Sequence, residues 1–524
     1  MLSVQPLKSA QGAADYYTSA FNYYAGDAQA LRWLGKGCER LGLTGIVEKE
    51  QMLALLEGQL PNGQVLKNEK GEHRPGFDMT FSAPKSVSIL SGLGADDKLS
   101  QLHDQAVEKA IRLIEKEFAQ ARVVIDGKVH YVDTGNLVVA AFRQPSSRAN
   151  DPALHTHGVT MNLTFTSVDG KARSLASDIN GNFGVVEQLQ QHVTYAGLLY
   201  RTELANLLKE QGYRLRDVGK GMFEIEGVPE EVLKEFSRRR HDIEEKMKEE
   251  GWEGSRLSSR ATLLTRNAKE ELDINVLRTD WQKRAEHLGF DAQAFVSSHK
   301  NITESSKTSG FFTFIKERLF ERFYGKEDLV ALQVKEAVFV AIETLSSQTS
   351  VFELQQLKEN ALKHTLSGRT IVPIQAIDAM IDTHIKSGLL YQAADPMTRC
   401  PMLTTPWALT LETETLARIE SNQGILKPIA NTHAVLQAQI SYEASASFPL
   451  TPSQKNALMH VFTSTDRFNA IQGYAGTGKT TMLQLTKGLA SDKGFSLRGM
   501  AVTSSAVNEL RDKAGMCSDN YFCV

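Results

Sequence analysis

A phosphate-binding loop near the C-terminus constrains the possible folds of this 524-residue chain more than any other stretch. The segment GYAGTGKT, residues 473–480, fits the pattern G-x-x-x-x-G-K-[ST] and lies between a short apolar run, FNAIQ, and an apolar helical run. Glycines in this motif let backbone N–H groups surround phosphate oxygens. The context predicts a strand, a loop and a helix of a P-loop nucleotide-binding fold, and the alternative is an ordinary glycine-rich turn.

The loop residues that we predict to contact a nucleotide are Gly473, Gly476, Gly478, Lys479 and Thr480. In P-loop proteins the lysine reaches the outer phosphates and the hydroxyl contacts magnesium, so ATP is the expected ligand. Hydrolysis also needs an acidic residue on a later strand and a group that orients water. After the loop we identify a strand, LRGMAVTS, and a helix, SAVNELRDKAG, but no further strand. We therefore expect a truncated domain that hydrolyses ATP poorly or not at all.

The stretch FRQPSSRANDPALHTHGVTM, residues 142–161, carries two histidines one residue apart within a predicted strand. Side chains at i and i+2 of a strand point to the same face, so His155 and His157 project together. A hairpin that folds around SSRANDPA places Gln144 opposite His155 on that face. Two imidazoles and an amide oxygen form a partial shell for a divalent cation and leave positions for substrate oxygens. The alternative is a pair of half-exposed, hydrogen-bonded histidines without a special role.

Two tyrosine pairs lie near the N-terminus, Tyr16 with Tyr17 and Tyr23 with Tyr24. Their spacing of seven residues is close to two helical turns, so one helix directs both pairs to the same side. An aromatic core stripe is the alternative, but hydroxyl groups that each need a partner suit a dry core poorly. Asp78 lies on the polar face of the alternating strand GFDMTFS, where a carboxylate indicates a local hydrogen bond or a chemical role.

The net charge of the chain limits how it can bind nucleic acid. A formal net charge of −3 gives no electrostatic case for bulk nucleic-acid binding, so any such binding depends on local patches. The conspicuous basic run is SRRRH at 237–241, followed by Arg256, Arg260, Arg266 and Lys269. Acidic residues are mixed into it, and a solvated helix face explains it about as well as a phosphate groove does.

The cysteines and the hydropathy pattern indicate the compartment. Four widely scattered cysteines form no ligand-spaced cluster, which suits a reducing cytoplasm. We find no signal peptide and no apolar run long enough to span a bilayer. The sequence therefore predicts a cytoplasmic protein without membrane insertion.

The order of the patterns predicts an α/β multi-domain chain of four parts. Residues 1–295 mix helices and strands, 296–325 form a polar linker, 326–445 are mainly helical, and 446–524 form an incomplete P-loop domain. In the first part we expect strands over residues 77–81, 122–125 and 129–133, and helices over residues 49–57, 96–119, 185–211 and 229–250.

Four sequence blocks, taken together, resemble the MobF class of conjugative relaxases, the bifunctional relaxase-helicases. The blocks are DYY with NYY, then GFDMTFSAPKSVS, then TGNLVVAAFRQ with LHTHGVTMN, and finally the P-loop. The resemblance covers residues 1–295 closely and 326–514 more loosely. It implies an N-terminal α+β relaxase domain whose antiparallel sheet carries a His-x-His metal site. It also implies sequence-specific nicking at a transfer origin and binding of single-stranded DNA.

The resemblance assigns the nucleophiles and the carboxylate of the reaction. It implies that Tyr16 is the first nucleophile, that Tyr17, Tyr23 and Tyr24 are the other members of the set, and that Asp78 is the family carboxylate. LTPSQKNAL resembles the adenine-reading motif of superfamily 1 helicases, with Gln454 in the reading position. AVTSSAVNEL resembles the next motif of those helicases, and their later motifs are absent.

The resemblance also assigns the metal ligands. His155 and His157 match two of the family's three metal-binding histidines, and Gln144 stands where relatives commonly carry the third. An amide oxygen is a weaker and harder ligand than an imidazole, which favours magnesium or manganese over zinc. Arg148, in the turn between the two metal-binding strands, is placed to contact a DNA phosphate.

The expected function is therefore that of a divalent-metal-dependent conjugative DNA relaxase. A tyrosine attacks a phosphodiester at a plasmid transfer origin, which forms a 5′-phosphotyrosine adduct and frees a 3′-hydroxyl, while helicase activity is expected to be lost. Implied partners are origin DNA, relaxosome accessory proteins and a type IV secretion coupling protein, with transfer of the protein alongside DNA into a recipient cell. The alternatives are a rolling-circle replication initiator and a nucleotide-binding DNA motor fragment without nicking activity.

Overall fold

The computed structural model describes most of the chain in two compact units, Met1–Pro406 and Trp407–Val524. The described residues are 1–19, 30–67, 73–177, 184–252, 261, 272–305, 330–367, 372–395, 400–446, 448–474, 476–501, 503–515 and 517–520. Several residues singled out from the sequence lie outside this part of the chain: Tyr23, Tyr24, Arg256, Arg260, Arg266 and Lys269.

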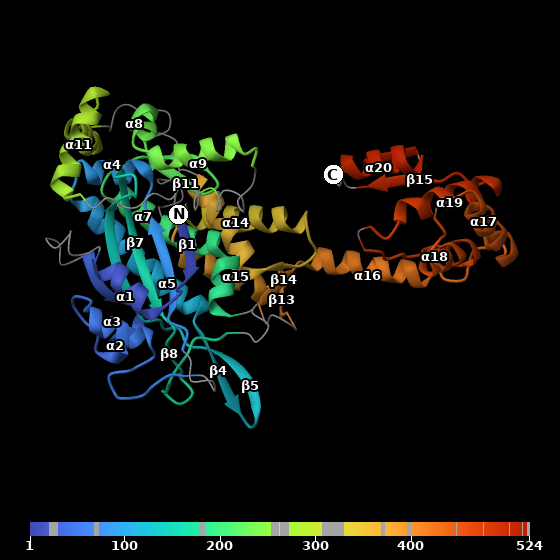
Figure 1. The fold of residues 1–524 in the computed structure, drawn as a ribbon, viewed down its shortest axis with the longest axis horizontal. Coiled ribbons are helices and arrows are strands. Elements are labelled where there is room, and N and C mark those ends of the chain that lie inside the picture. The colour runs from blue at the N-terminus through green and yellow to red at the C-terminus, as the bar shows by residue number, and fades with distance from the viewer. Residues whose placement is uncertain are drawn as a thin grey trace. The chain divides into compact units, whose positions relative to one another are not determined.

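A five-stranded sheet with strand order β1-β3-β7-β6-β2 forms the centre of the first unit (Figure 1). Its strands are β1 (Leu2–Pro6), β2 (Leu31–Leu34), β3 (Gly76–Ser82), β6 (Val139–Ser146) and β7 (Pro152–Met161). All neighbouring strands in this sheet run antiparallel. The antiparallel sheet that the sequence predicted for this part of the chain is therefore confirmed, although β2 was not among the predicted strands.

Each face of this sheet has its own hydrophobic core, because successive side chains of a strand point to opposite faces. The larger core combines Phe77, Met79 and Phe81 with residues of α4 (Lys85–Gly92), α5 (Lys98–Phe118) and α7 (Val193–Glu210). The smaller core combines Trp33 and Phe142 with residues of α1 (Ala10–Ser19), α2 (Lys36–Leu41) and α3 (Lys49–Leu56). The polar residues that the sequence singled out lie on the face with the smaller core.

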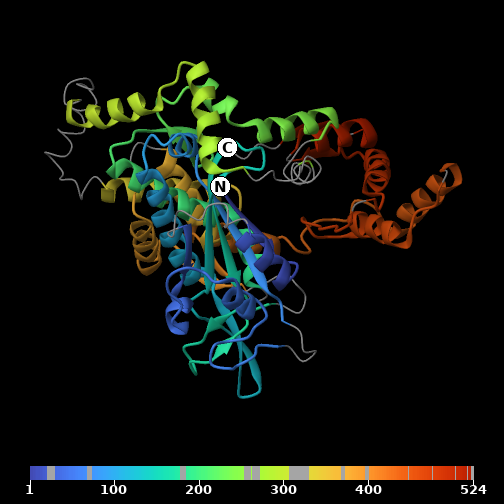
Figure 2. The same cartoon turned by 60° about the vertical axis from the view of Figure 1, so that its left-hand side comes forward.

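Short ladders and further helices complete the sheet-centred part of the first unit. β4 (Gln120–Ile125) and β5 (Lys128–Asp133), both predicted, form a ribbon that extends away from the sheet in Figures 1 and 2. Two unpredicted ladders join β8 (Thr164–Phe165) to β9 (Ala172–Arg173), and β10 (Leu215–Gly219) to β11 (Met222–Ile225). The other helices are α6 (Val185–Gln191), α8 (Glu230–Glu235), α9 (Arg238–Glu249), α11 (Ile274–His287) and α12 (Ala292–Ser305).

Residues 330–404 pack against this sheet-centred part and share its larger core. They comprise a helix over 330–346, then β12 (Phe352–Glu353), α14 (Leu354–Ser367), α15 (Ile374–Lys386), β13 (Tyr391–Ala394) and β14 (Pro401–Thr404). Lys358 of α14 forms ion pairs with Glu117 at 3.1 Å and with Asp378 at 3.0 Å. The boundary between the two compact units lies at residue 406. α12 includes the first residues of the predicted linker. The division of the chain into four functional parts stays a prediction.

The second unit contains α17 (Thr432–Ser445), α18 (Pro452–Thr463), α19 (Lys479–Asp492), β15 (Arg498–Ala501), α20 (Ser504–Ala514) and β16 (Cys517–Asn520), preceded by α16 (Pro406–Glu420). Two of the strand predictions made from the sequence are wrong for the second unit. The described residues 464–474 form no strand before the P-loop, and Phe468 and Ile471 of the apolar run FNAIQ are exposed there. A strand does follow α20, because β16 pairs in parallel with β15.

None of the described helices is both long enough and apolar enough to cross a membrane.

Candidate active site

The residues predicted for DNA nicking converge where β6 turns into β7. A cavity of about 1100 Å³ lies at this end of the sheet, and its lining includes Tyr16, Gln144, Arg148, His155 and His157. These residues come from α1 and from the continuous hairpin of β6, the turn and β7, so two separate stretches of the sequence meet here. The cavity is large enough to hold part of a polymeric ligand.

Strand register places the predicted metal ligands on one face of the sheet. Gln144 of β6 lies directly opposite His155 of β7, and Thr80 of β3 lies opposite His157. Residues that lie opposite each other in an antiparallel pair point to the same face. The predicted convergence of Gln144, His155 and His157 is thus seen in the structure, and their role as metal ligands stays a prediction.

Both imidazoles are oriented by oxygen acceptors at Nδ1. His157 Nδ1 lies 2.8 Å from Asp78 Oδ2, and His155 Nδ1 lies 2.7 Å from the carbonyl oxygen of Ala153. A carbonyl or carboxylate oxygen only accepts, so each Nδ1 carries the hydrogen and the lone pair of the neutral ring is on Nε2. Metal-binding histidines are commonly held in this way, with the second ring nitrogen bonded to an oxygen. The two side chains therefore fit a divalent cation.

The third donor of the predicted set is an amide rather than a charged group. The described residues contain no group of three or more His, Cys, Asp or Glu side chains arranged to hold a metal ion. Gln144 is buried and borders the cavity beside the two histidines, whose ring centroids are 5.1 Å apart. The set would thus consist of two imidazole nitrogens and one neutral oxygen, a mixture that suits magnesium or manganese better than a set of three imidazoles does.

Asp78 connects the histidines to the tyrosines. Its buried Oδ2 atom accepts hydrogen bonds from Tyr17 Oη at 3.0 Å, from Thr80 Oγ1 at 3.0 Å and from His157 Nδ1 at 2.8 Å. Its Oδ1 atom is also buried and has no hydrogen-bond partner among the described residues. A carboxylate in this position fixes the ring orientation of His157 and holds one phenol.

The two described tyrosines of the predicted set occupy different environments on α1. Tyr17 is buried, and burial followed by the charge of Asp78 raises the pKa of its hydroxyl well above the ordinary value. Tyr16 is 40% exposed, and Arg148 Nη2 donates a hydrogen bond to its hydroxyl oxygen at 3.2 Å. The rings of Tyr16 and Tyr17 meet edge to face with centroids 5.0 Å apart. Only Tyr16 thus combines access from the cavity with a cation at its oxygen among these two.

Some residues of the site were not identified from the sequence. Thr80 touches both Asp78 and His157, and its position two residues after Asp78 was the signal for it. Lys85 lines the cavity and donates from Nζ to the carbonyl oxygens of Pro152 and Phe236, both at 2.9 Å. Nothing in the local sequence around Lys85 indicates these partners, because they are far away along the chain.

The second unit holds the predicted phosphate-binding loop. Gly476 and Gly478 both have φ of +76°, a left-handed conformation that glycine adopts without strain. Gly478 is the N-cap of α19, whose first residue is Lys479, and Thr480 lies in the first turn of that helix. Backbone N–H groups at such a helix start are suited to bind anions.

Side chains around this loop contact its backbone. Lys479 Nζ donates to the carbonyl oxygens of Gly473 and Tyr474, both at 2.7 Å. Gln454 Nε2 donates to the carbonyl oxygens of Thr477 at 3.1 Å and of Gly478 at 3.3 Å. The residue predicted to recognise adenine therefore lies against the loop, and nucleotide binding by these residues stays a prediction.

Comparisons with known proteins match two different families to two parts of the chain. Residues 10–288 match the family described as TrwC relaxase, and residues 449–521 match the family described as AAA domain. The chain is 40% identical over 301 residues to the multifunctional conjugation protein TraI of Escherichia coli strain K12. It is 42% identical over 301 residues to a second Escherichia coli TraI. Each match covers 56% of this chain but only 17% of the relative, so the chain spans less than a fifth of those proteins.

Solved structures resemble more than half of the chain. The conjugative relaxase TrwC in complex with oriT DNA, in a metal-bound structure, is 34% identical with a TM-score of 0.50. A copper-bound complex of TrwC with oriT DNA is 36% identical, also with a TM-score of 0.50. Both matches cover 56% of this chain and 100% of the TrwC chain.

Proposed function

The chain belongs to the TrwC relaxase family, a MobF-class group, and on that premise we propose that it is a conjugative DNA relaxase. It cuts one strand at a plasmid transfer origin and keeps the 5′ end as a phosphotyrosine. The observation that carries this proposal is the single cavity bordered by Tyr16, Arg148, Gln144 and the two histidines. The Tyr16 phenol, the Arg148 guanidinium and the set of metal ligands can then act on one phosphate.

Tyr16 is the nucleophile that the geometry favours. Its Oη forms a bond to phosphorus, the bond from phosphorus to the 3′ oxygen breaks, and that oxygen takes up a proton. The phenolic proton leaves Tyr16 to solvent, to which this side chain is exposed. Arg148 stabilises the negative charge on the phenolic oxygen, because a guanidinium donates to it at 3.2 Å. One phosphate ester replaces another, so the step is reversible.

The metal site comprises Gln144, His155 and His157, which would hold a divalent cation through the amide oxygen and the two Nε2 atoms. The bound cation supplies charge neutralisation at the non-bridging oxygens of the scissile phosphate. Asp78 keeps His157 in the required tautomer through the 2.8 Å contact at Nδ1. The two TrwC structures described as metal-bound and copper-bound support a metal here, and the amide donor favours magnesium or manganese in this chain.

Tyr17, Tyr23 and Tyr24 serve later strand transfer in this proposal. Tyr17 already donates to Asp78 at 3.0 Å, so this carboxylate is placed to accept its proton when a second junction is broken. More than one phenol lets the protein stay attached to one DNA end while it breaks another junction. The second pair lies outside the described residues, and its part in the reaction rests on the family alone.

The remaining features extend the proposal to other ligands. The match to an AAA domain and the helix-capping glycine loop support binding of ATP in the second unit. Single-stranded origin DNA is the proposed substrate, and the structures of TrwC in complex with oriT DNA support origin DNA as the ligand. Relaxosome accessory proteins and a secretion coupling protein are proposed partners because the TraI relatives are named conjugation proteins.

Covalent capture of an oligonucleotide tests the proposed function. We expect the protein, mixed with a single-stranded transfer-origin oligonucleotide and Mg²⁺ or Mn²⁺, to give an adduct that survives denaturing electrophoresis. EDTA should prevent the adduct, and ATP should have no effect on its yield. The absence of an adduct with the origin sequence, or an adduct that forms only with ATP, would contradict the proposal.

A further inference from the structure

The turn between β6 and β7 carries Arg148 into the cavity, so the position of this turn decides where the guanidinium meets Tyr16. The turn is tight: Ser147 N donates to the carbonyl oxygen of Asp151 at 2.9 Å, and Asn150 N donates to that of Ser147 at 3.0 Å. Asn150 has φ of +55°, a left-handed conformation that asparagine tolerates. A small movement of this backbone would therefore change the position of the Arg148 side chain.

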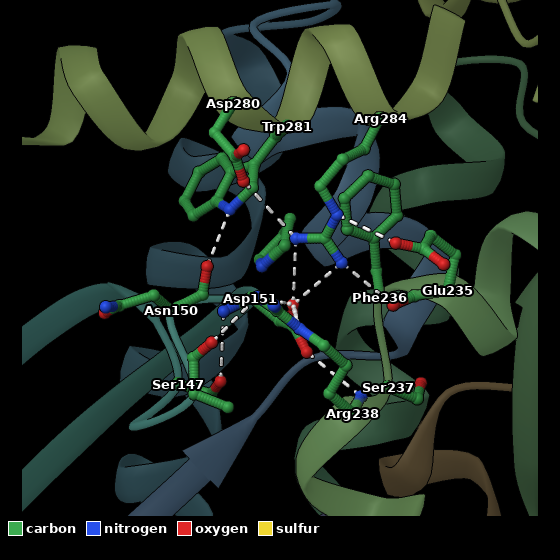
Figure 3. Close-up of polar contacts among 12 residues, drawn as sticks. Ser147, Asn150, Asp151, Glu235, Phe236, Ser237, Arg238, Asp280, Trp281 and Arg284 are labelled. Atoms are coloured by element: carbon green, nitrogen blue, oxygen red, sulfur yellow. Dashed lines mark hydrogen bonds and ion pairs between the residues drawn. The ribbon is translucent and has the colours of Figure 1, made fainter. Parts of the chain in front are cut away.

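Asp151, at the end of the turn, is a buried carboxylate shared by two arginines. It is 1% exposed. Arg238 approaches it with its backbone N at 3.0 Å, its Nε at 2.9 Å and its Nη2 at 2.8 Å. Arg284 approaches it with Nη1 and Nη2, both at 3.2 Å. Figure 3 shows both guanidinium groups directed at this one carboxylate.

The two arginines fix the turn to helices that come much later in the chain. Arg238 is the first residue of α9, so Asp151 also accepts from the N–H at the start of that helix. Arg284 lies on α11, donates from Nε to Glu235 at 2.8 Å and stacks on the ring of Phe236 at 4.6 Å. The carboxylate thus joins the turn to the end of α8, the start of α9 and the last turn of α11.

Two backbone carbonyl groups of the turn accept hydrogen bonds from side chains of α9 and α11. Arg238 Nη2 donates to the carbonyl oxygen of Ala149 at 3.0 Å. Trp281, fully buried on α11, donates from Nε1 to the carbonyl oxygen of Asn150 at 2.8 Å, as Figure 3 shows. Three successive residues after Arg148 are therefore each bonded to α9 or α11.

We propose that Asp151, Arg238 and Arg284 form a positioning device that sets Arg148 against the Tyr16 hydroxyl. The proposal rests on the proposed function, since it concerns the same nucleophile. Buried ion clusters add little net stability compared with apolar packing of the same volume, so stability alone is a weak reason for this arrangement. All its contacts with the turn fall on residues 149–151, next to Arg148, which is the expected arrangement for control of geometry.

Substitution of Arg284 tests the device. We expect Arg284→Met to slow single-turnover adduct formation at saturating origin oligonucleotide by about tenfold to a hundredfold, because small displacements of reacting groups are costly. Oligonucleotide affinity, measured by fluorescence anisotropy, should change by less than about twofold, because Arg284 lies behind the turn. In an Arg148→Ala background the same substitution should change the rate by less than about twofold, since the group that it positions is gone.

Arg278→Met is the matched control on the same helix. Arg278 donates from Nε to the carbonyl oxygen of Gly92 at 3.3 Å, and its side chain forms no hydrogen bond with turn residues 147–151 in the described part of the chain, so its loss should leave the rate unchanged. Equal losses of rate from Arg278→Met and Arg284→Met would overturn the proposal. So would an Arg284→Met effect of the same size with and without Arg148, because that is the signature of a general loss of stability.

A second variant and a second measurement keep the test independent of folding and of nicking. Should Arg284→Met not fold, Asp151→Asn keeps the shape and removes the charge, and the same rate ratios are expected. Hydrogen exchange of the DNA-free protein should show faster exchange at amides 149–151 in either variant, and unchanged exchange there would overturn the proposal. Wild-type protein without any adduct would refute the proposed function, while the exchange result would still decide whether the device holds the turn.

Discussion

Chemically similar residues of this site differ in role because their surroundings differ. Tyr16 and Tyr17 are neighbours on α1, yet one is exposed beside a guanidinium and the other is buried on a carboxylate. The spacing of the tyrosines placed both in one set, and only the family resemblance distinguished Tyr16, because the difference in surroundings depends on Asp78 and Arg148, which are distant along the chain. The histidine pair was easier to interpret, since an i, i+2 spacing on a strand fixes a shared face.

Gln144→His should change the metal preference of the site. Three imidazoles suit zinc and other transition metals better than two imidazoles and an amide do, so we expect zinc affinity to rise by about tenfold or more. Isothermal titration with Zn²⁺ and with Mn²⁺ measures the change. Gln144→Leu, which keeps a similar size without a donor atom, should weaken binding of both metals. Unchanged zinc affinity in Gln144→His would show that this position does not contact the metal.

Tyr17→Phe should make the protein less sensitive to alkaline pH. Burial and then Asp78 raise the pKa of the Tyr17 hydroxyl, whereas a tyrosine of the unfolded chain ionises near about pH 10. The stabilisation from the protonated hydroxyl is complete below about pH 10 and is lost as the pH rises towards the folded value. Between about pH 9.5 and 11 the wild type should lose up to about 1.4 kcal/mol more per pH unit than Tyr17→Phe in urea denaturation.

The exposed Tyr391 provides the control for this pH dependence, because Tyr391→Phe removes no buried hydroxyl. Identical slopes of unfolding free energy against pH for Tyr17→Phe and the wild type would contradict the assignment.

Secondary-structure elements were predictable where one local pattern sufficed. β3 alternates polar and apolar side chains, and β6 and β7 were predictable from the hairpin that joins them and from the i, i+2 spacing of the two histidines. The apolar run FNAIQ before the P-loop failed as a strand prediction. A strand needs a hydrogen-bonded neighbour, and none pairs with these residues in the described part of the second unit. β2 was missed because four residues carry too little alternation.

Gly76→Ala should disrupt the pairing of β3 with β7. Gly76 has φ of +137°, and an added Cβ would lie 1.9 Å from the carbonyl oxygen of Thr160, so strand pairing itself would have to shift. Gly135→Ala is the control, because its φ of +61° is also strained for alanine but nothing lies within 4 Å. We expect Gly76→Ala to lower the unfolding free energy by at least about 2 kcal/mol more than Gly135→Ala does. Equal losses would mean that the sheet yields easily at this position.

At the scale of the whole molecule, all the described residues of the candidate nicking site belong to the first unit. Its helical part 330–404 shares a core with the sheet-centred part, although the linker-like sequence between them indicated separate domains. Sequence patterns report local periodicity and contain no signal for docking between distant segments. The bonds of Asp151 to Arg238 and Arg284 were not foreseeable for the same reason, since they join residues 87 and 133 positions apart.

A chain that ends at residue 406 should form the adduct as fast as the whole chain. All described residues of the nicking site belong to the first unit, and ATP is not consumed in the exchange of one phosphate ester for another. Single-turnover rates of the two proteins with the same oligonucleotide and Mg²⁺ measure this. A loss of more than about tenfold in the shortened protein would show that the second unit takes part in the reaction.

The most direct test of the central claim is to find the tyrosine that carries the DNA. The adduct formed with a single-stranded transfer-origin oligonucleotide is digested with protease and nuclease, and the modified peptide is sequenced by mass spectrometry. We predict a nucleotide on Tyr16 after the first cut, and no adduct from Tyr16→Phe under the same conditions. A first adduct confined to Tyr17, Tyr23 or Tyr24, or a full yield from Tyr16→Phe, would contradict the account.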